Sequence, residues 1–257
     1  MSFLTVENIH HSYFTPKTVT TALKDINFSV EKGEFISLVG PSGCGKTTML
    51  SILSGLIQPT QGSVIIDGQS PDNQVRSIGY MLQQDYLFPW KTIEENILLG
   101  LKLKNKLSIE SKQKSLELLK EIGLEGVEKQ YPRQLSGGMR QRAALVRTLA
   151  INPKILLLDE PFSALDYQTK LKLEDLVFET LKAYQKTAVL VTHDIGEAIS
   201  MSDRILLFAA KPGRLHKIFT VPEQLRELRP FDVRSKEEYS TLFQEIWKEL
   251  ESLENSE

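Results

Sequence analysis

A nine-residue stretch, GPSGCGKTT, carries residue types that can hold a phosphate chain. It follows the apolar run FISLV and precedes MLSIL, which we expect to form a short helix ending near Gly55. In such a strand–loop–helix unit, glycines let backbone N–H groups approach phosphate oxygens, and the helix dipole adds positive potential there. The stretch predicts a nucleotide-binding loop, here called the phosphate loop, made of Gly40, Pro41, Ser42, Gly43, Cys44, Gly45, Lys46, Thr47 and Thr48.

Two side chains of the phosphate loop have the chemistry to contact a nucleotide. Lys46 can reach the β- and γ-phosphates as a point charge, and the hydroxyl of Thr47 is placed to ligate Mg²⁺. A chance glycine-rich turn is the alternative, but it would need neither the strand before it nor the helix after it. We interpret Cys44 as a small residue tolerated in the loop rather than as a reactive thiol.

An acidic pair ends a second apolar run, ILLLDE, at positions 155–160. A carboxylate at such a strand end, beside a phosphate loop, can hold Mg²⁺ through water, and we assign this role to Asp159. Hydrolysis also needs a group that orients and deprotonates the attacking water, and Glu160 is the candidate. An Asp-Glu pair after an apolar run is commonplace, so this interpretation depends on the phosphate loop.

The segment LSGGMRQR, at positions 135–142, has the features of a second anion site. Ser136 is a good N-cap for the helix expected to run to Ala150, and Gly137 and Gly138 expose backbone N–H groups at the helix N-terminus. Taken alone, the segment is equally well explained as an ordinary capped helix. We call it the signature segment.

The patterns that must position these residues predict an α/β fold. Residues 4–10, 26–30 and 63–67 are expected to form strands. This N-terminal third would combine antiparallel strands with the start of a parallel core. Strand and helix then alternate, with strands expected at 78–82, 155–158, 187–192 and 204–208. This alternation predicts a mainly parallel sheet with helices on both faces and a nucleotide at the carboxyl ends of its strands, where Gly40, Asp159 and His193 fall.

Two regions depart from this alternation. Residues 85–150 show no strand but a capping box at Thr92 and a helix over 108–122, so they predict a helical subdomain inserted into a single domain of residues 1–257. Residues 210–257 read as a C-terminal appendix, with a second capping box at residues 235–238. One face of its helix is apolar and is expected to pack against the main domain rather than to bind a partner: Tyr239, Leu242, Phe243, Ile246, Trp247 and Leu250.

Bulk properties exclude several classes of protein. A net charge of −2 over 257 residues implies no strong attraction to nucleic acid or to anionic lipid. The single cysteine excludes an internal disulfide and fits a reducing compartment. The N-terminus does not read as a signal peptide, and no apolar run could span a bilayer, so we expect a soluble protein whose membrane link goes through a partner. We expect residues 249–257 to fray, and His10, His11 and His216 to be ordinary surface or loop histidines.

Six motifs in order resemble those of the ATP-binding subunits of ABC transporters, and the resemblance covers nearly the whole chain. They are GPSGCGKTT, Gln83, LSGGMRQR, ILLLDEP, the run Ser163-Ala164-Leu165-Asp166, and Thr192-His193-Asp194. The signature segment has Met139 where Gln is commonest in the family, which leaves the glycine N–H groups unaffected. The resemblance implies an ATPase that uses ATP and Mg²⁺.

The resemblance also implies roles for individual residues. Tyr13 would stack on the adenine, although its neighbour Phe14 is an alternative. Gln83, rather than the adjacent Gln84, would sense Mg²⁺ and the attacking water, and His193 would contact the γ-phosphate. Two copies would form a head-to-tail dimer in which Ser136 and Gly138 of one close on the ATP held by Lys46 of the other, with Asp166 at the interface.

The partners implied by the resemblance lie at the membrane. Exposed aromatics at positions 85–90 (DYLFPW, here the aromatic loop) would form the groove that receives a helix of the permease, unless they pack inside the helical subdomain. The closest pattern is that of importers of sulfonates, nitrate or taurine, with importers of thiamine precursors or riboflavin as alternatives. The protein would then sit peripherally on the cytoplasmic face of the membrane and meet an extracytoplasmic solute-binding protein only indirectly.

Two other classes of protein also use a phosphate loop. A soluble chromosome-maintenance or DNA-repair ATPase would carry long heptads or a basic patch, which this sequence lacks. A small-molecule kinase would have no need of Ser136, Gly137, Gly138 or His193. We therefore favour an ABC ATPase that drives solute import. The sequence of this chain does not identify the transported solute.

Overall fold

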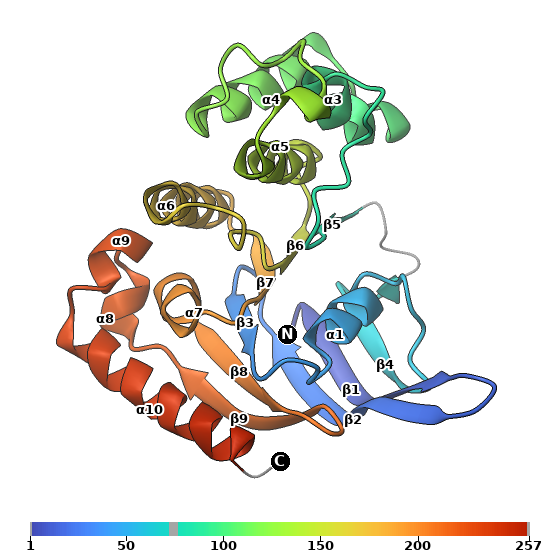
Figure 1. Ribbon diagram of the computed structural model, residues 1–257, viewed down its shortest axis with the longest axis vertical. Helices are drawn as coiled ribbons and strands as arrows, with labels where there is room; N and C mark the ends of the chain where they lie inside the picture. The colour runs from blue at the N-terminus through green and yellow to red at the C-terminus, as the bar shows by residue number, and fades with distance from the viewer. Residues whose placement is uncertain (1, 72–76, 256–257) are drawn as a thin grey trace.

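Two β-sheets form the frame of the molecule (Figure 1). The computed structural model describes residues 2–71 and 77–255. The smaller sheet is antiparallel, with strand order β2-β1-β4, and comprises β1 (Leu4–Phe14), β2 (Val19–Val30) and β4 (Gln61–Ile66). The larger sheet has the order β5-β6-β7-β3-β8-β9 and comprises β3 (Phe35–Val39), β5 (Ile78–Met81), β6 (Ile155–Asp159), β7 (Thr187–Val191), β8 (Arg204–Ala209) and β9 (Arg214–Thr220).

The larger sheet is parallel from β5 to β8, as the sequence predicts, but β9 pairs antiparallel with β8. This strand was not expected, because the chain past Gly213 read as an appendix. In RLHKIFT only Phe219 is buried, while its neighbours are exposed or half-buried. An edge strand covered on one face lacks the continuous apolar run that marks a central strand.

Strand β6 shows why the central strands are apolar throughout. Its residues alternate between two packed cores, which lie on opposite faces of the sheet. Ile155 and Leu157 pack with α1 (Lys46–Leu53) and the antiparallel sheet, whereas Leu156 and Leu158 pack with α5 (Gly137–Ala150) and α6 (Tyr167–Ala183). Each such burial stabilises the fold by about 1.5–3 kcal/mol. The expectation of helices on both faces needs one correction, since the antiparallel sheet shares the first face with α1.

The inserted subdomain contains α3 (Ile93–Leu103), α4 (Ile109–Glu121), the turn η2 (Pro132–Gln134) and α5, and Figure 1 shows it at the top of the view, on the side of the larger sheet where β5 and β6 lie. No strand occurs between residues 85 and 150, all of which the structure describes. The predicted capping box is present, because Glu95 N–H donates to Thr92 Oγ1 (3.2 Å) and Thr92 N–H donates to Glu95 Oε2 (2.8 Å). Leu119, Ile97 and Val146 from these helices join the core that covers β6.

The C-terminal segment contains α8 (Glu223–Arg226), α9 (Pro230–Val233) and α10 (Glu237–Glu254), which follow α7 (Ile195–Met201) and the last two strands. Leu242 and Ile246 are buried against the main domain, as predicted, while Trp247 is half exposed. The capping box predicted at residues 235–238 is wrong. The Ser235 hydroxyl donates to the Asp232 carbonyl instead, and the N-cap, Lys236, makes no side-chain cap bond.

The predicted fraying of residues 249–257 is also wrong for most of that tail, since α10 continues to Glu254. Positions 256 and 257 lie outside the described residues. Across residues 2–71 and 77–255, no helix has the length and apolar character needed to cross a membrane.

Candidate functional site

A cavity of about 900 Å³ opens at the carboxyl ends of the central strands. Eleven of the residues singled out in the sequence line it, although they come from five separate parts of the chain: Tyr13, Gly40, Ser42, Gly43, Gly45, Lys46, Thr47, Thr48, Gln83, Glu160 and His193. The cavity therefore has the position that a parallel sheet predicts for a ligand site.

Glycine is required at two points of the phosphate loop. A Cβ on Gly40 would lie 2.4 Å from the carbonyl oxygen of Phe208, at the end of β8. Gly45 has φ of +90° and would place a Cβ 2.6 Å from Leu23. Because α1 begins directly after Gly45 and has no side-chain cap, its first N–H groups point to the loop and can bind an anion.

The side chain of Lys46 folds back onto the backbone of the phosphate loop. Lys46 Nζ donates to the carbonyls of Gly40 (2.7 Å) and Pro41 (3.0 Å), and it lies 3.4 Å from Cys44 Sγ. Cys44 is fully buried, and burial raises the pKa of its thiol. A buried, protonated thiol is a poor nucleophile, which agrees with a packing role for this residue.

Asp159 and Thr47 meet beside the cavity. The Thr47 hydroxyl lies 3.4 Å from Asp159 Oδ1, and burial is the main cause that raises the pKa of the Asp159 carboxyl. A hydroxyl and a carboxylate are hard oxygen donors of the kind that Mg²⁺ prefers. Across residues 2–71 and 77–255, no three His, Cys, Asp or Glu side chains gather as a metal site. These two donors fit a cation that takes its other ligands from water and phosphate.

The three residues expected to act on the reaction meet at Glu160. Gln83 Nε2 donates to Glu160 Oε2 at 3.0 Å, and His193 Nδ1 lies 3.3 Å from Glu160 Oε1. Glu160 has φ of +48°, a left-handed conformation uncommon for a residue with a side chain. The His193 side chain remains 69% exposed, so it is open to a ligand in the cavity.

The aromatic end of the cavity is formed by Tyr13. Its hydroxyl lies 3.2 Å from Thr48 Oγ1, whereas Phe14 is 70% exposed and does not line the cavity. His11 contacts the Tyr13 ring edge-on, with 4.6 Å between ring centroids. The expectation that His11 is a surface residue is wrong, because it is buried and neither ring nitrogen has a hydrogen-bond partner.

The signature segment and Asp166 lie elsewhere. Ser136 caps α5 by accepting from the Met139 N–H at 3.3 Å, and Asp166 caps α6 by accepting from the Thr169 N–H at 3.0 Å. A Cβ on Gly138 would contact Leu165 at 3.2 Å, so the two caps belong to neighbouring loops. Neither Ser136, Gly137, Gly138 nor Asp166 lines the cavity. The structure thus divides the predicted site residues into two groups.

Several residues that line the cavity were not predicted. They are Val191, the outer part of β2 at residues 19–22, and the turn Lys211-Pro212-Gly213. The turn is fastened to β2, because Gly213 N–H donates to the Ala22 carbonyl (3.0 Å) and Lys24 N–H donates to the Gly213 carbonyl (2.8 Å). The Pro212-Gly213 pair directly after a predicted strand was a signal, since a turn there falls at the same sheet edge as the phosphate loop.

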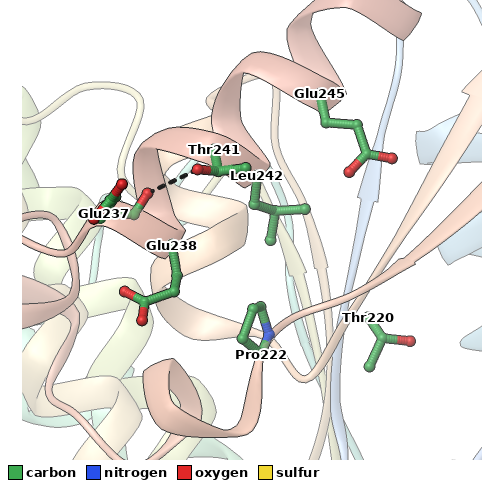
Figure 2. Close-up of a pocket in the computed structure, with 7 residues that line it drawn as sticks. All are labelled: Thr220, Pro222, Glu237, Glu238, Thr241, Leu242 and Glu245. Atoms are coloured by element: carbon green, nitrogen blue, oxygen red, sulfur yellow. Dashed lines mark hydrogen bonds between the residues drawn. The ribbon is translucent and has the colours of Figure 1, made fainter.

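A second hollow, of about 440 Å³, lies between the start of α10 and the end of β9 (Figure 2). Three glutamates line it together with Thr220, Pro222, Thr241 and Leu242: Glu237, Glu238 and Glu245. A cluster of carboxylates repels phosphate, which favours the cavity at the sheet edge as the candidate nucleotide site.

Residues 23–163 match the family model described as ABC transporter. The chain belongs to the ABC transporter family. The matched region contains the phosphate loop, the signature segment and Glu160, and it ends before Asp166 and His193.

Individual relatives of this ABC protein extend the match beyond that region. It is 65% identical to the Bacillus subtilis (strain 168) protein named "Uncharacterized ABC transporter ATP-binding protein YtlC", over 100% of this chain and 99% of the relative. It is 43% identical to an aliphatic sulfonates import ATP-binding protein, SsuB, of Bacillus cereus, over 93% and 90% of the two chains.

A solved structure gives the same fold. The dimeric post-hydrolysis state of the ATP-binding cassette MJ0796, bound to ADP and Pi, matches 85% of this chain and 99% of its own, with 37% identity and a TM-score of 0.79. As an ATP-binding subunit of the ABC transporter family, this protein is an ATPase. The predicted P-loop fold is confirmed, as is the predicted likeness to sulfonate-import ATPases.

Proposed function

We propose that this ABC ATPase energises the import of a small organic or inorganic anion, such as an aliphatic sulfonate, through a membrane permease. The family membership and the likeness to an aliphatic sulfonates import ATP-binding protein support this proposal. The protein would act as a peripheral subunit on the cytoplasmic face of the membrane. An extracytoplasmic binding protein would deliver the solute, and taurine and nitrate remain within the same substrate class.

The observation that carries the proposal is the separation of two anion sites in one chain. The phosphate loop lines the cavity, whereas Ser136 and Gly137 are exposed at the start of another helix and line no part of it. A head-to-tail dimer would bring the second site of one copy onto the nucleotide held by the other, with Asp166 at the interface. The dimeric state of the solved cassette supports this arrangement.

In this reaction the cavity residues would bind and orient ATP. Tyr13 would stack on the adenine, while Lys46 and the loop N–H groups would hold the phosphates. Mg²⁺, held by Thr47, Asp159 and the amide oxygen of Gln83, would neutralise charge on the phosphate oxygens.

Glu160 would orient the attacking water and take its proton. Its carboxylate already lies between Gln83 and His193, so two neighbours fix its position. His193 would contact the γ-phosphate through the face that is exposed in the cavity. Hydrolysis would then depend on Ser136 and Gly138 of the second copy, which would complete the surroundings of the γ-phosphate.

The permease would bind at the aromatic loop. Tyr86 and Trp90 are 59% and 69% exposed, which favours a contact surface over packing inside the helical subdomain. Arg147 donates to the carbonyls of Asp85 and Tyr86, both at 2.7 Å, and Arg140 Nε lies 3.0 Å from Asp85 Oδ2. Both arginines belong to α5, so a movement of the signature segment would reach the permease through this loop.

The mutation Glu160→Gln tests the composite site. The variant should bind ATP without hydrolysing it and should elute as a dimer at saturating ATP, because closure needs binding but opening needs hydrolysis. Wild-type protein under the same conditions is the control and should return to monomer as ATP is consumed. A variant that stays monomeric with saturating ATP contradicts the head-to-tail mechanism.

The substrate class needs a separate experiment. Vesicles that contain this ATPase with its permease and binding protein should take up a radiolabelled aliphatic sulfonate when ATP is inside them. The same vesicles carrying Glu160→Gln should not. Uptake of thiamine precursors or riboflavin, but not of sulfonates, would contradict the proposed substrate and leave the ATPase mechanism intact.

A further inference from the structure

Five charged side chains from three parts of the chain meet next to His193, since one of them belongs to the following residue, Asp194. They are called the anchor cluster here: Lys170, Glu174, Asp194, Glu197 and Arg234. Lys170 Nζ lies 2.6 Å from Asp194 Oδ2, 3.2 Å from Glu197 Oε2 and 3.9 Å from Glu174 Oε1. Arg234 Nη2 lies 2.6 Å from Glu174 Oε2. Lys170 and Glu174 come from α6, and Arg234 follows α9 in the C-terminal segment.

The cluster holds the backbone on both sides of His193. The Thr192 hydroxyl donates to Glu197 Oε2 and accepts from the Asp194 N–H, both at 3.0 Å. Asp194 in turn caps α7 by accepting from the Glu197 N–H at 3.0 Å. His193 is therefore flanked by two residues whose side chains are fixed, although its own side chain is exposed. This short bonded loop fixes the backbone that carries the ring, whose Nδ1 lies 3.3 Å from Glu160 Oε1.

The C-terminal segment completes the charge balance of the cluster. Glu174 is fully buried, and Arg234 is the cation closest to its carboxylate in the cluster. With Arg234 removed, Lys170 would be the one cation left in the cluster for three carboxylates. Burial raises the pKa of Glu174 and that of Glu197, the latter to about 7, and a proton on Glu197 would leave two carboxylates for the two cations. A buried carboxylate without a cation is costly, so Lys170 would be drawn from Asp194 toward Glu174.

We propose that Arg234 is a positioning residue for ATP hydrolysis. By pairing with Glu174, it leaves Lys170 bonded to Asp194 and so fixes the loop that presents His193. This inference rests on the role of His193 in the proposed function. It gives the C-terminal segment, which contributes no residue to the cavity, a direct influence on the chemical step.

A second contact joins the same segment to the loop. A Cβ on Gly196, in the first turn of α7, would lie 2.6 Å from the Tyr239 hydroxyl of α10 and 3.1 Å from Asp194 Oδ1. The helices α10 and α7 are thus packed without space for a side chain at this point. Displacement of the C-terminal segment would therefore alter the packing around Asp194, the residue next to His193.

A purely structural Arg234 would also lower the thermal stability of the protein when removed, so stability cannot decide the question. The positioning role makes a different prediction for kinetics. Arg234→Met should lower kcat for ATP roughly 10-fold, because small displacements of a catalytic group have large effects on rate. The Kd for a non-hydrolysable ATP analogue should stay within about twofold, since the phosphate loop and Tyr13 are untouched.

Three further variants make the test specific. Arg234→Lys keeps the charge and should restore most of kcat. Glu174→Gln combined with Arg234→Met removes the unpaired carboxylate, so Lys170 stays on Asp194 and kcat should recover. In a His193→Ala background, measured by single-turnover hydrolysis of radiolabelled ATP, Arg234→Met should cause no further loss, because both changes act through the same side chain.

Each alternative gives a distinct result. A wild-type kcat in Arg234→Met, with a lower Tm, overturns the positioning role, as do losses that multiply in the His193→Ala background. If Arg234→Met does not fold, the charge-neutral double variant with Glu174→Gln decides the question, and a low kcat there overturns the proposal. A wild-type chain without ATPase activity would overturn the proposed function itself, whereas an active wild type whose variants are equally active overturns only this inference.

Discussion

Two helix N-termini of this ABC ATPase, those of α1 and α5, have the features of anion sites, yet they differ in every respect that decides whether one can bind alone. The first lies in a cavity beneath a glycine loop, has no side-chain cap and carries Lys46 in its first turn. The second is exposed and is capped by its own Ser136 side chain. The cation at the second end, Arg140, is already bonded to Asp85 and to the Leu135 carbonyl.

The difference indicates a division of labour between the two ends. We expect the α1 end to bind a nucleotide in a single copy, because glycine geometry, N–H groups and a cation are all present. The α5 end offers backbone N–H groups and a helix dipole worth about 0.3–1 kcal/mol at an exposed site, but its cation is already bonded, so we do not expect it to capture a phosphate alone. In the proposed head-to-tail dimer, the α5 end would act on a phosphate that the second copy already holds. The predictions below test this asymmetry.

Loss of the cation at α1 should have the largest effect. Lys46→Ala should weaken ATP binding roughly 100-fold, because charged hydrogen bonds contribute about 1.5–3 kcal/mol, and hydrolysis should be lost with it. Calorimetric titration with ATP checks the affinity. Near wild-type binding by this variant would mean that the N–H groups of the loop suffice. The cation would then not distinguish the α1 end from the α5 end.

A charge placed at the α5 end should stop hydrolysis without harming binding. Ser136→Asp keeps a good N-cap, so α5 should fold, but its carboxylate would repel a phosphate from the second copy by several kcal/mol. We expect hydrolysis to fall about 100-fold while the affinity of the monomer for ATP is unchanged. Ser136→Asn is the matched control, since it caps equally well and carries no charge. Equal activity of the two variants would argue against the composite site.

The aromatic loop should respond only when the permease is present. Trp90→Ala should leave the basal ATPase rate near that of wild type and weaken association with the permease by roughly 10-fold, because exposed aromatics often dominate an interface. Co-purification of the two proteins from detergent measures the effect. Unchanged co-purification would show that Trp90 makes no contact with the permease, and that α5 is coupled to the membrane elsewhere.

A last prediction concerns the dependence of stability on pH and involves neither helix end. Burial raises the pKa of Glu197 from 4.5 to about 7, so over this interval the folded state binds more protons than the unfolded state. Stability should therefore fall as pH rises from 4.5 to 7, by up to about 3 kcal/mol at 1.4 kcal/mol per pKa unit. Glu197→Gln should flatten the curve, as urea unfolding at pH 5 and pH 8 can measure. The same slope in both proteins would assign it to other groups.

Much of this site could be predicted from the sequence, because its parts are short runs with a strong local signal. The phosphate loop, the acidic end of β6 and the N-cap of α5 each need only a few neighbouring residues to be recognised. The approach of Gln83 and His193 to Glu160 is different, since it depends on the order of strands in the sheet. The family resemblance supplied their roles, and the fold supplied the distances.

Of three features that were missed, two depend on contacts between distant residues. His11 has the composition of a surface residue but is buried beside Tyr13, and β9 carries too few apolar residues to mark an edge strand. The capping box at Ser235 failed because α10 begins two residues later and a nearer carbonyl accepts the hydroxyl hydrogen bond. The bond at Ser235 is local, since Asp232 lies three residues earlier, whereas the burial of His11 and the pairing of β9 with β8 are tertiary contacts.

The left-handed backbone of Glu160 has a consequence for the evolution of this ATPase. A side chain at φ of +48° costs on the order of 1 kcal/mol relative to glycine, so the protein is less stable with the residue that the proposed mechanism needs at this position. Selection for heat resistance alone, without selection for activity, should therefore enrich glycine or asparagine at position 160. Such an experiment should yield stable proteins that bind ATP but do not hydrolyse it.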